Sequence, residues 1–122
     1  MRFFARLMLS AFALGATSVQ AAEPTFDLIC RGLSGQKLHY RFDLAQKKWC
    51  IDQCQSVWGI DRLSDSMIEL VTFSSDGQND WTIKIDRYTG AFAAIRRGFG
   101  SEPKDTGACE AKTFSGFPGK KF

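Results

Sequence analysis

Apolar and polar residues alternate along several short runs of this 122-residue chain. In the clearest run, residues 37–44, every second residue is large and apolar, and those between are charged or polar. A period of two is that of a β-strand with one buried face and one face in water. The same alternation occurs over residues 26–31 and 81–86, and a Gly-containing turn follows each run. We therefore predict antiparallel hairpins that join 26–31 to 37–44 and 81–86 to 91–97.

Two further strands are expected, at residues 67–73 and 108–114, the first of them paired with the run at 81–86. The segment 57–70 fits two interpretations, because its apolar residues recur at helical spacing while Ser64–Ser66 is typical of a turn between strands. Gly59 and the β-branched residues favour strands, and one short helix is the alternative. The sequence thus predicts an all-β fold, a small antiparallel barrel or sandwich of six to seven strands.

The first 21 residues predict a secretory signal peptide. Arg2 and Arg6 precede an apolar run from Leu7 to about Ala16, and the segment ends in small and polar residues up to Ala21. The apolar run has roughly ten residues, which is too short to cross a membrane as a helix. Removing residues 1–21 leaves 101 of the 122 and lowers the formal net charge from +3 to +1, because it takes away two Arg and no acid. We expect a periplasmic or secreted protein with no membrane span in the mature chain.

An even number of cysteines in an exported chain of this size is typical of a disulfide framework. Cys30, Cys50, Cys54 and Cys109 allow three pairings. We expect Cys50–Cys54, which are close in sequence, and Cys30–Cys109, which would join the first and last strands. The long loop should stabilise the fold by about 4 kcal/mol or more, and the short loop by about 2 kcal/mol. The C-I-D-Q-C spacing differs from that of a C-x-x-C redox motif, and oxidising conditions disfavour a four-cysteine zinc site.

Few residues are suited to catalysis. The single histidine, His39, lies on the polar face of its strand, where we interpret it as a solvated surface residue. No G-x-S-x-G elbow is present to position a nucleophilic serine, and the polar tip at 74–80 lacks the EF-hand spacing for calcium. We expect no catalytic residue, cofactor or metal. The alternative is a small envelope hydrolase that uses a carboxylate pair from Asp61, Asp65 and Glu69, which would share one side of the segment only in a helix.

Aromatic residues carry the functional signal, because exposed aromatic side chains anchor protein partners or stack on sugars. Trp58 and Tyr88 lie near expected turns, and with Trp81 they form the candidate binding surface. A mature charge of +1 argues against nucleic-acid binding. We predict a non-enzymatic domain at residues 22–114, followed by an irregular tail at 115–122, that binds a protein or glycan partner in the envelope or outside the cell.

The layout resembles that of the membrane-bound inhibitors of C-type lysozyme, since it is an exported β-domain with Cys30 in its first strand and Cys109 in its last. This resemblance implies a small barrel that blocks a lysozyme cleft with a protruding loop, and hence an inhibitor of a cell-wall hydrolase. It covers the layout only. The family has a Ser-Gly-Ala-Arg-Tyr type loop before an aromatic-Trp strand, whereas residues 74–81 read SSDGQNDW, so no functional residue is carried over.

Overall fold

The computed structural model describes residues 24–73 and 80–119. The expected signal peptide at 1–21 and most of the polar tip at 74–80 lie outside these ranges. Within them the chain forms nine strands and no helix. The strands are β1 (Thr25–Gly32), β2 (Lys37–Asp43), β3 (Lys48–Ile51), β4 (Trp58–Gly59), β5 (Arg62–Leu63), β6 (Met67–Thr72), β7 (Trp81–Asp86), β8 (Ala91–Arg96) and β9 (Asp105–Lys112).

The all-β class is confirmed. The strand count is higher than the expected six to seven because the nine strands include β4 and β5, which have only two residues each. Residues 57–70 form short strands and a turn, so the helical alternative is wrong. The expected last strand, 108–114, begins earlier at Asp105 and ends at Lys112. Its earlier start lets β9 pair with β8 as well as with β1.

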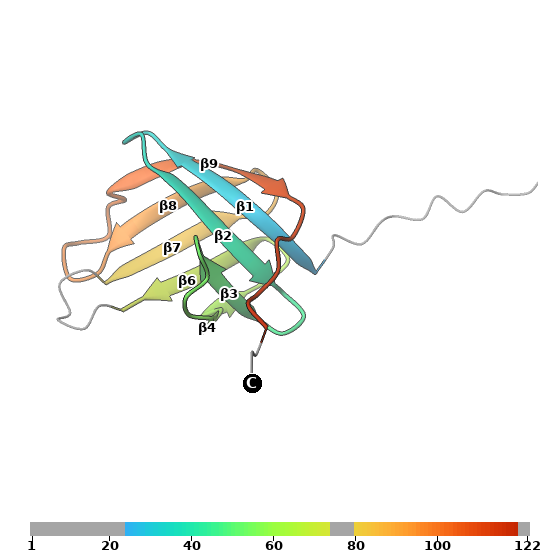
Figure 1. Cartoon of the computed structure of the whole chain (residues 1–122). Coiled ribbons are helices and arrows are strands. Elements are labelled where there is room, and N and C mark those ends of the chain that lie inside the picture. The colour runs from blue at the N-terminus through green and yellow to red at the C-terminus, as the bar shows by residue number, and fades with distance from the viewer. Residues whose placement is uncertain (1–23, 74–79, 120–122) are drawn as a thin grey trace, which may run out of the picture.

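All strands belong to one antiparallel sheet in the order β4-β3-β2-β1-β9-β8-β7-β6-β5, which curls into a half-barrel (Figure 1). Both expected hairpins are present, with Leu28 opposite Tyr40 in one and Ile83 opposite Ala94 in the other. β6 pairs with β7 as predicted. Because β1 and β9 are neighbours, the two hairpins are joined through the last strand of the chain.

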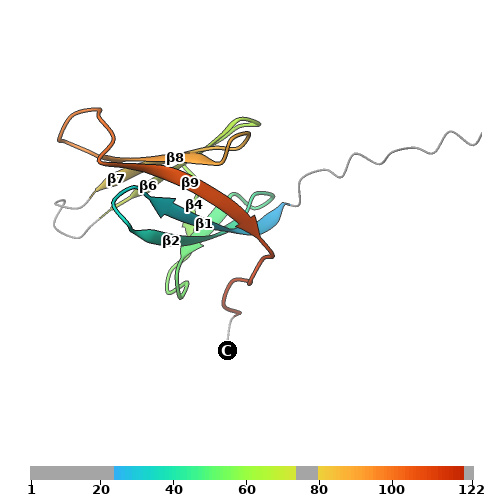
Figure 2. The same ribbon diagram turned by 90° about the horizontal axis from the view of Figure 1, so that it is seen from above.

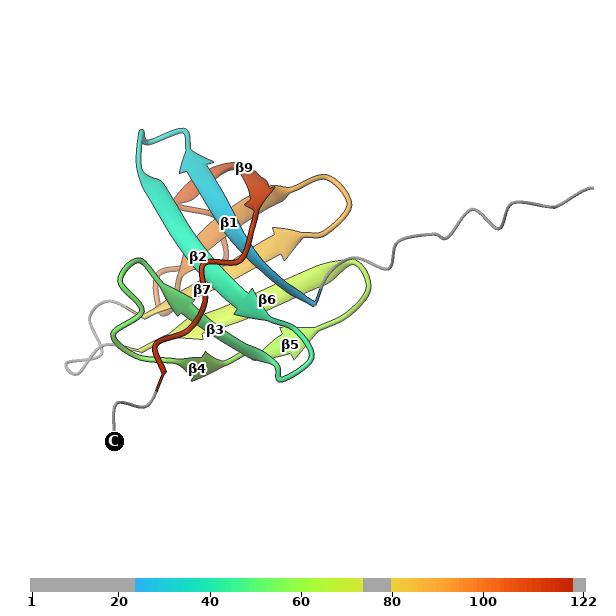
Figure 3. The ribbon, with the colours of Figure 1, turned by 45° about the vertical axis from the view of Figure 1, so that its right-hand side comes forward.

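The two outermost strands of the sheet, β4 and β5, lie in one continuous segment, residues 58–63. β4 pairs with β3, and β5 pairs with β6. Between them the amide of Ile60 donates to the carbonyl oxygen of Lys47 at 2.8 Å, and the amide of Asp61 donates to that of Glu69 at 3.1 Å. Figure 3 shows this segment running from β3 to β6. The segment therefore links the two edges of the curled sheet.

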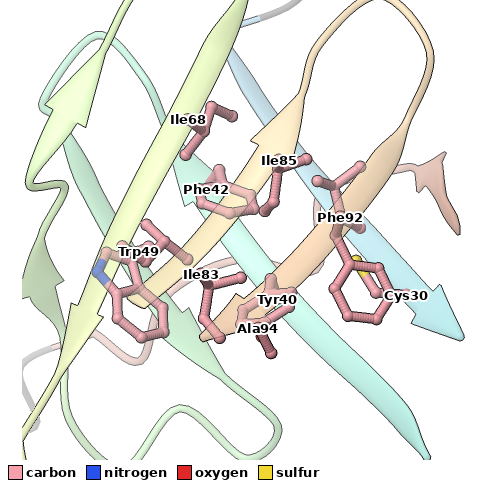
Figure 4. Close-up of a cluster of buried hydrophobic side chains, with 11 residues drawn as sticks. Cys30, Tyr40, Phe42, Trp49, Ile68, Ile83, Ile85, Phe92 and Ala94 are labelled. Atoms are coloured by element: carbon pink, nitrogen blue, oxygen red, sulfur yellow. The ribbon is translucent and has the colours of Figure 1, made fainter. Parts of the chain in front are cut away.

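Side chains from alternate positions of the strands fill the inside of the half-barrel (Figure 4). The bulkiest come from β2 and β3, where Tyr40, Phe42 and Trp49 are each at most 2% exposed. The indole nitrogen of Trp49 donates to the carbonyl oxygen of Gly59 at 3.1 Å, so the buried donor is satisfied and β4 is held against the core. Ile68, Leu70, Ile83, Ile85, Phe92 and Ala94 complete the core from β6, β7 and β8.

Both expected disulfides are present. Cys30 and Cys109 are directly opposed on β1 and β9, with their Cα atoms 4.0 Å apart. Cys50 and Cys54 close a tight turn in which Asp52 and Cys54 adopt positive φ angles of 51° and 57°. The first disulfide therefore ties the first strand to the last inside the core, and the second pins the loop that follows β3.

Gly107 lies where β9 passes between β8 and β1, opposite Phe92 on one side and Gly32 on the other. A Cβ atom at this position would overlap the carbonyl oxygen of Arg31 and lie 2.7 Å from the ring of Phe92. Only glycine allows so close an approach of three strands. This residue sets how tightly β9 can pack at the centre of the sheet.

Candidate functional site

One end of the half-barrel contains a pocket of about 760 Å³. It forms because β9 changes neighbours along its length. β9 pairs with β8 only as far as Ala108, and the amide of Cys109 then donates to the carbonyl oxygen of Gly90 in the β7–β8 turn at 2.7 Å. The residues of β9 beyond Cys109 pair with β1 alone. Figure 2 shows β9 diverging from β8 at this end. The inner face of the sheet is consequently left open between the end of β9 and the β7–β8 turn.

The inside of the pocket is apolar. Phe26 and Leu28 of β1 face it, and Ile68 and Ile85 contribute from β6 and β7. Ala111 of β9 also lines the pocket and is exposed, although it lies two residues beyond Cys109 and therefore on the inner face of the strand. An exposed apolar residue on a face that is otherwise buried is the direct sign that the core is open here.

The rim of the pocket is the β7–β8 turn, which is held in place by its own hydrogen bonds. One carboxylate oxygen of Asp86 accepts from the backbone amides of Tyr88 at 2.8 Å and Thr89 at 3.0 Å. These two hydrogen bonds hold the pKa of Asp86 below its usual value, and the bond from Thr89 has the larger effect. Gly90 adopts a φ of 76°, and a guanidinium nitrogen of Arg87 donates to the carbonyl oxygen of Ser64 at 2.7 Å. Tyr88 therefore projects, 80% exposed, from a fixed turn.

The three aromatic residues expected to form one binding surface are in three different places. Tyr88 lines the pocket. Trp58 is 45% exposed on β4, with its ring centroid 4.9 Å from that of Trp49. Trp81 is half-buried against the core and lines a second pocket of about 240 Å³. Trp81 is the first residue of β7 and Tyr88 lies two residues beyond its end, so they are separated by roughly 20 Å along the strand direction.

The carboxylates of the hydrolase alternative do not line either pocket. Asp61 and Asp65 are exposed, and Asp65 lies in the turn between β5 and β6, while Glu69 is half-buried on β6. In residues 24–73 and 80–119, no group of three or more His, Cys, Asp or Glu side chains is placed to hold a metal ion. No helix in the same ranges is long and apolar enough to cross a membrane.

A cluster around Asp27 was not anticipated from the sequence. Asp27 is only 3% exposed on the outer side of β1. One of its carboxylate oxygens lies 2.6 Å from Nε2 of His39 and accepts from the hydroxyl of Ser115 at 2.6 Å, while the other accepts from the Ser115 amide at 3.1 Å. His39 is thus half-buried and bonded, which corrects the expectation of a solvated side chain.

This cluster contains the residue types of a hydrolase triad but in a different order. A serine nucleophile needs a histidine that accepts its proton, with the carboxylate behind the histidine. Here Asp27 lies between the other two, and the Ser115 hydroxyl bonds the carboxylate directly. Burial acts to raise the pKa of Asp27, but the hydrogen bonds from the Ser115 side chain, His39 and the Ser115 backbone outweigh it, so this pKa is lowered. The arrangement stabilises a carboxylate and does not activate a serine.

The Asp27 cluster instead anchors the C-terminal tail. Residues 113–119 form no helix or strand, and they cross the outer face of β1 and β2 (Figures 1 and 3). A guanidinium nitrogen of Arg41 on β2 donates to the carbonyl oxygen of Gly116 at 2.9 Å, and the other donates to that of Asp52 at 2.8 Å. Ser115 could not be assigned this role from the sequence, because it lies 88 positions from Asp27.

No family model, curated protein or solved structure matches this chain. The function is therefore argued from the pocket and the surface. Of the features described, the pocket at the end of β9 is the largest opening to an apolar interior.

Proposed function

We propose that this protein is an exported domain that binds a small ligand with an apolar body in the pocket at the end of β9. One observation carries the proposal: the apolar inner face of the half-barrel is open at this end, where Ala111 is exposed beside buried core residues. A volume of about 760 Å³ falls within the range of ligand pockets, which are mostly apolar with a few polar groups.

The polar groups at the rim suit recognition of a ligand with a polar end. Thr25, Thr89 and Thr113 supply hydroxyl groups beside the apolar floor, and Tyr88 supplies an aromatic ring with a polar tip. The lining residues include no histidine, and the Asp86 carboxylate is bonded to the turn. These side chains favour binding over catalysis.

Export is part of the same proposal. It is supported by the pattern of residues 1–21 and by the two disulfides, because disulfides persist mainly in oxidising compartments. The periplasm and the extracellular space both satisfy this condition. A protein or glycan partner, as expected from the aromatic residues, would instead use Tyr88 from outside the pocket.

A matched pair of substitutions on β9 tests the pocket. Ala111→Trp places an indole in the pocket, whereas Ala108→Trp places one on the outer face of the same strand, where the residue is also exposed. The probe is the apolar fluorophore anilinonaphthalene sulfonate, titrated into the chain that begins at residue 22. We expect saturable binding that Ala111→Trp weakens about tenfold or more, and that Ala108→Trp leaves unchanged.

Equal binding by the two variants would contradict the proposal, as would the absence of saturable binding to the folded chain. Circular dichroism and thermal midpoints of both variants check that folding is retained. Native mass spectrometry of the protein recovered from a cell-envelope extract then gives the mass of any bound molecule, and the same measurement on Ala111→Trp should lack it.

A further inference from the structure

Three large apolar side chains are exposed on three loops at the end of the half-barrel opposite the pocket. Leu33 lies in the β1–β2 turn and is 86% exposed. Phe73 directly follows β6 and is 76% exposed, and Phe99 lies in the β8–β9 loop and is 55% exposed. Each lies beyond the end of a strand, away from the buried core. Side chains this exposed contribute nothing to the interior of the fold.

The strand register places all three at the same end. Thr72, which precedes Phe73, is opposite Trp81, and Trp81 is opposite Arg96. The amide of Leu33 donates to the carbonyl oxygen of Thr106, near the start of β9. The second pocket, of about 240 Å³, opens between these loops, with Gln36, Thr72 and Asp105 in its lining. Tyr88 and the larger pocket lie at the other end of the same strands.

Each of the two phenyl rings carries a guanidinium group on its face. Arg96 lies 4.1 Å from the ring centroid of Phe99, and Arg97 lies 4.5 Å from that of Phe73. Arg97 also pairs with Asp80 at 3.3 Å, which fixes its position. Cation–π contacts of this kind hold ring and charge together as one amphipathic unit. The loops therefore present apolar groups with positive charge immediately beside them.

We propose that this end of the domain docks on the surface of an anionic phospholipid bilayer. Leu33, Phe73 and Phe99 enter the boundary between headgroups and acyl chains, and the exposed Lys37 and Lys104 face the phosphates. A bilayer accepts separate apolar side chains at this depth, and basic residues beside them add attraction to anionic lipids. Because the apolar side chains come from three loops and guanidinium groups lie beside two of them, this end matches the amphipathic boundary of an anionic bilayer.

The charges around the three loops are compatible with an anionic surface. Lys37 and Lys104 are exposed at this end and add to the two arginines. Of the acids at this end that the structure describes, Asp80 pairs with Arg97, and Asp105 accepts hydrogen bonds from the amide and hydroxyl of Ser34. Glu102 is exposed in the β8–β9 loop and opposes the attraction. The apolar side chains are therefore expected to supply most of the affinity, and the lipid charge a smaller part.

Co-sedimentation with vesicles tests the proposal. The chain that begins at residue 22 is used, so that the apolar run of residues 7–16 is absent. We expect it to sediment with vesicles of equal parts phosphatidylglycerol and phosphatidylcholine, and less with phosphatidylcholine alone. Combining Leu33→Ser, Phe73→Ser and Phe99→Ser should lower the partition coefficient about tenfold or more. Tyr88→Ser, an equally exposed aromatic at the other end, should leave it unchanged.

Quenching by brominated lipid locates the contact. Vesicles that contain brominated acyl chains should quench the added tryptophan fluorescence of Phe99→Trp but not that of Tyr88→Trp. The fluorescence of the wild type gives the contribution of the native tryptophans, which is subtracted. Absence of sedimentation with either vesicle, equal partitioning of the triple variant and the wild type, or equal quenching at residues 88 and 99 would each overturn the proposal. All the substituted residues are exposed, so we expect the variants to stay folded. Their thermal midpoints check this and show whether a loss of binding is due to unfolding.

Discussion

Replacing Asp27 with alanine should destabilise the protein by about 3 kcal/mol at neutral pH. The carboxylate is 3% exposed and contacts three polar groups: Nε2 of His39, and the hydroxyl and the amide of Ser115. Hydrogen bonds to a charged group contribute about 1.5–3 kcal/mol each to stability, and bonds that share one carboxylate are not additive. Because burial opposes the bonds at Asp27, the net loss is well below their sum.

The pH dependence distinguishes a bonded carboxylate from simple packing. The pKa of Asp27 is lower in the folded protein than its usual value of 3.8. Its stabilising effect is therefore fully present above that value and is lost as the pH falls through the folded-state pKa. Urea unfolding at pH 7 should give a midpoint about 2 M lower for Asp27→Ala than for the wild type, and this difference should shrink at pH 2–3.

Two further substitutions control the interpretation. Ser115→Ala removes the hydrogen bond from the hydroxyl to Asp27 and should lower the free energy of unfolding by about 1 kcal/mol. This loss should also shrink at low pH. Asp65→Ala removes a carboxylate that is exposed in a turn and should change stability by less than about 0.5 kcal/mol. A loss of the same size at pH 7 and at pH 2–3 for Asp27→Ala would refute the reasoning, since it would assign the effect to volume and not to charge.

Two predictions concern the covalent and backbone constraints on the sheet. Replacing both Cys30 and Cys109 by alanine should lower the free energy of unfolding by about 4 kcal/mol, and replacing both Cys50 and Cys54 by about 2 kcal/mol. The difference arises because the stabilisation grows with the length of the closed loop, and thermal denaturation of the two double variants compares them. Gly107→Ala should lower the thermal midpoint by several degrees, since its Cβ would overlap a β1 carbonyl oxygen, and an unchanged midpoint would mean that β9 can shift without cost.

The parts of the fold that depend on neighbouring residues could be predicted from the sequence. The alternation over residues 26–31 and 37–44 fixes which face of each strand is buried, and the glycine-containing turn between them fixes their antiparallel pairing. The disulfide from Cys50 to Cys54 follows in the same way from a short separation. These features depend on contacts within one hairpin or turn, which the local pattern specifies.

The candidate site could not be predicted, because it depends on where β9 lies. Phe26, Leu28 and Ile85 have the pattern of core residues, and nothing in their own segments indicates that β9 leaves them partly uncovered. Tyr88 was identified as an exposed aromatic because it lies at a turn, which is a local property. Trp81 is also aromatic, but it begins β7, which has a neighbouring strand on each side, and packing against the core leaves it half-buried.

The two proposed surfaces lie at opposite ends of the same strands, and this separation makes the proposals independent. β7 runs from Trp81, beside the loops that carry Phe73 and Phe99, to Asp86 at the rim of the larger pocket. Docking of the loop end on a bilayer would therefore turn the mouth of that pocket away from the lipid, so its ligand would enter from the aqueous side. The substitution at Ala111 and those at the loop tips are a strand length apart, so their effects should be independent. A loop-tip variant that still binds the fluorophore is therefore folded, and an Ala111 variant that still binds vesicles is folded. Either proposal can fail while the other holds.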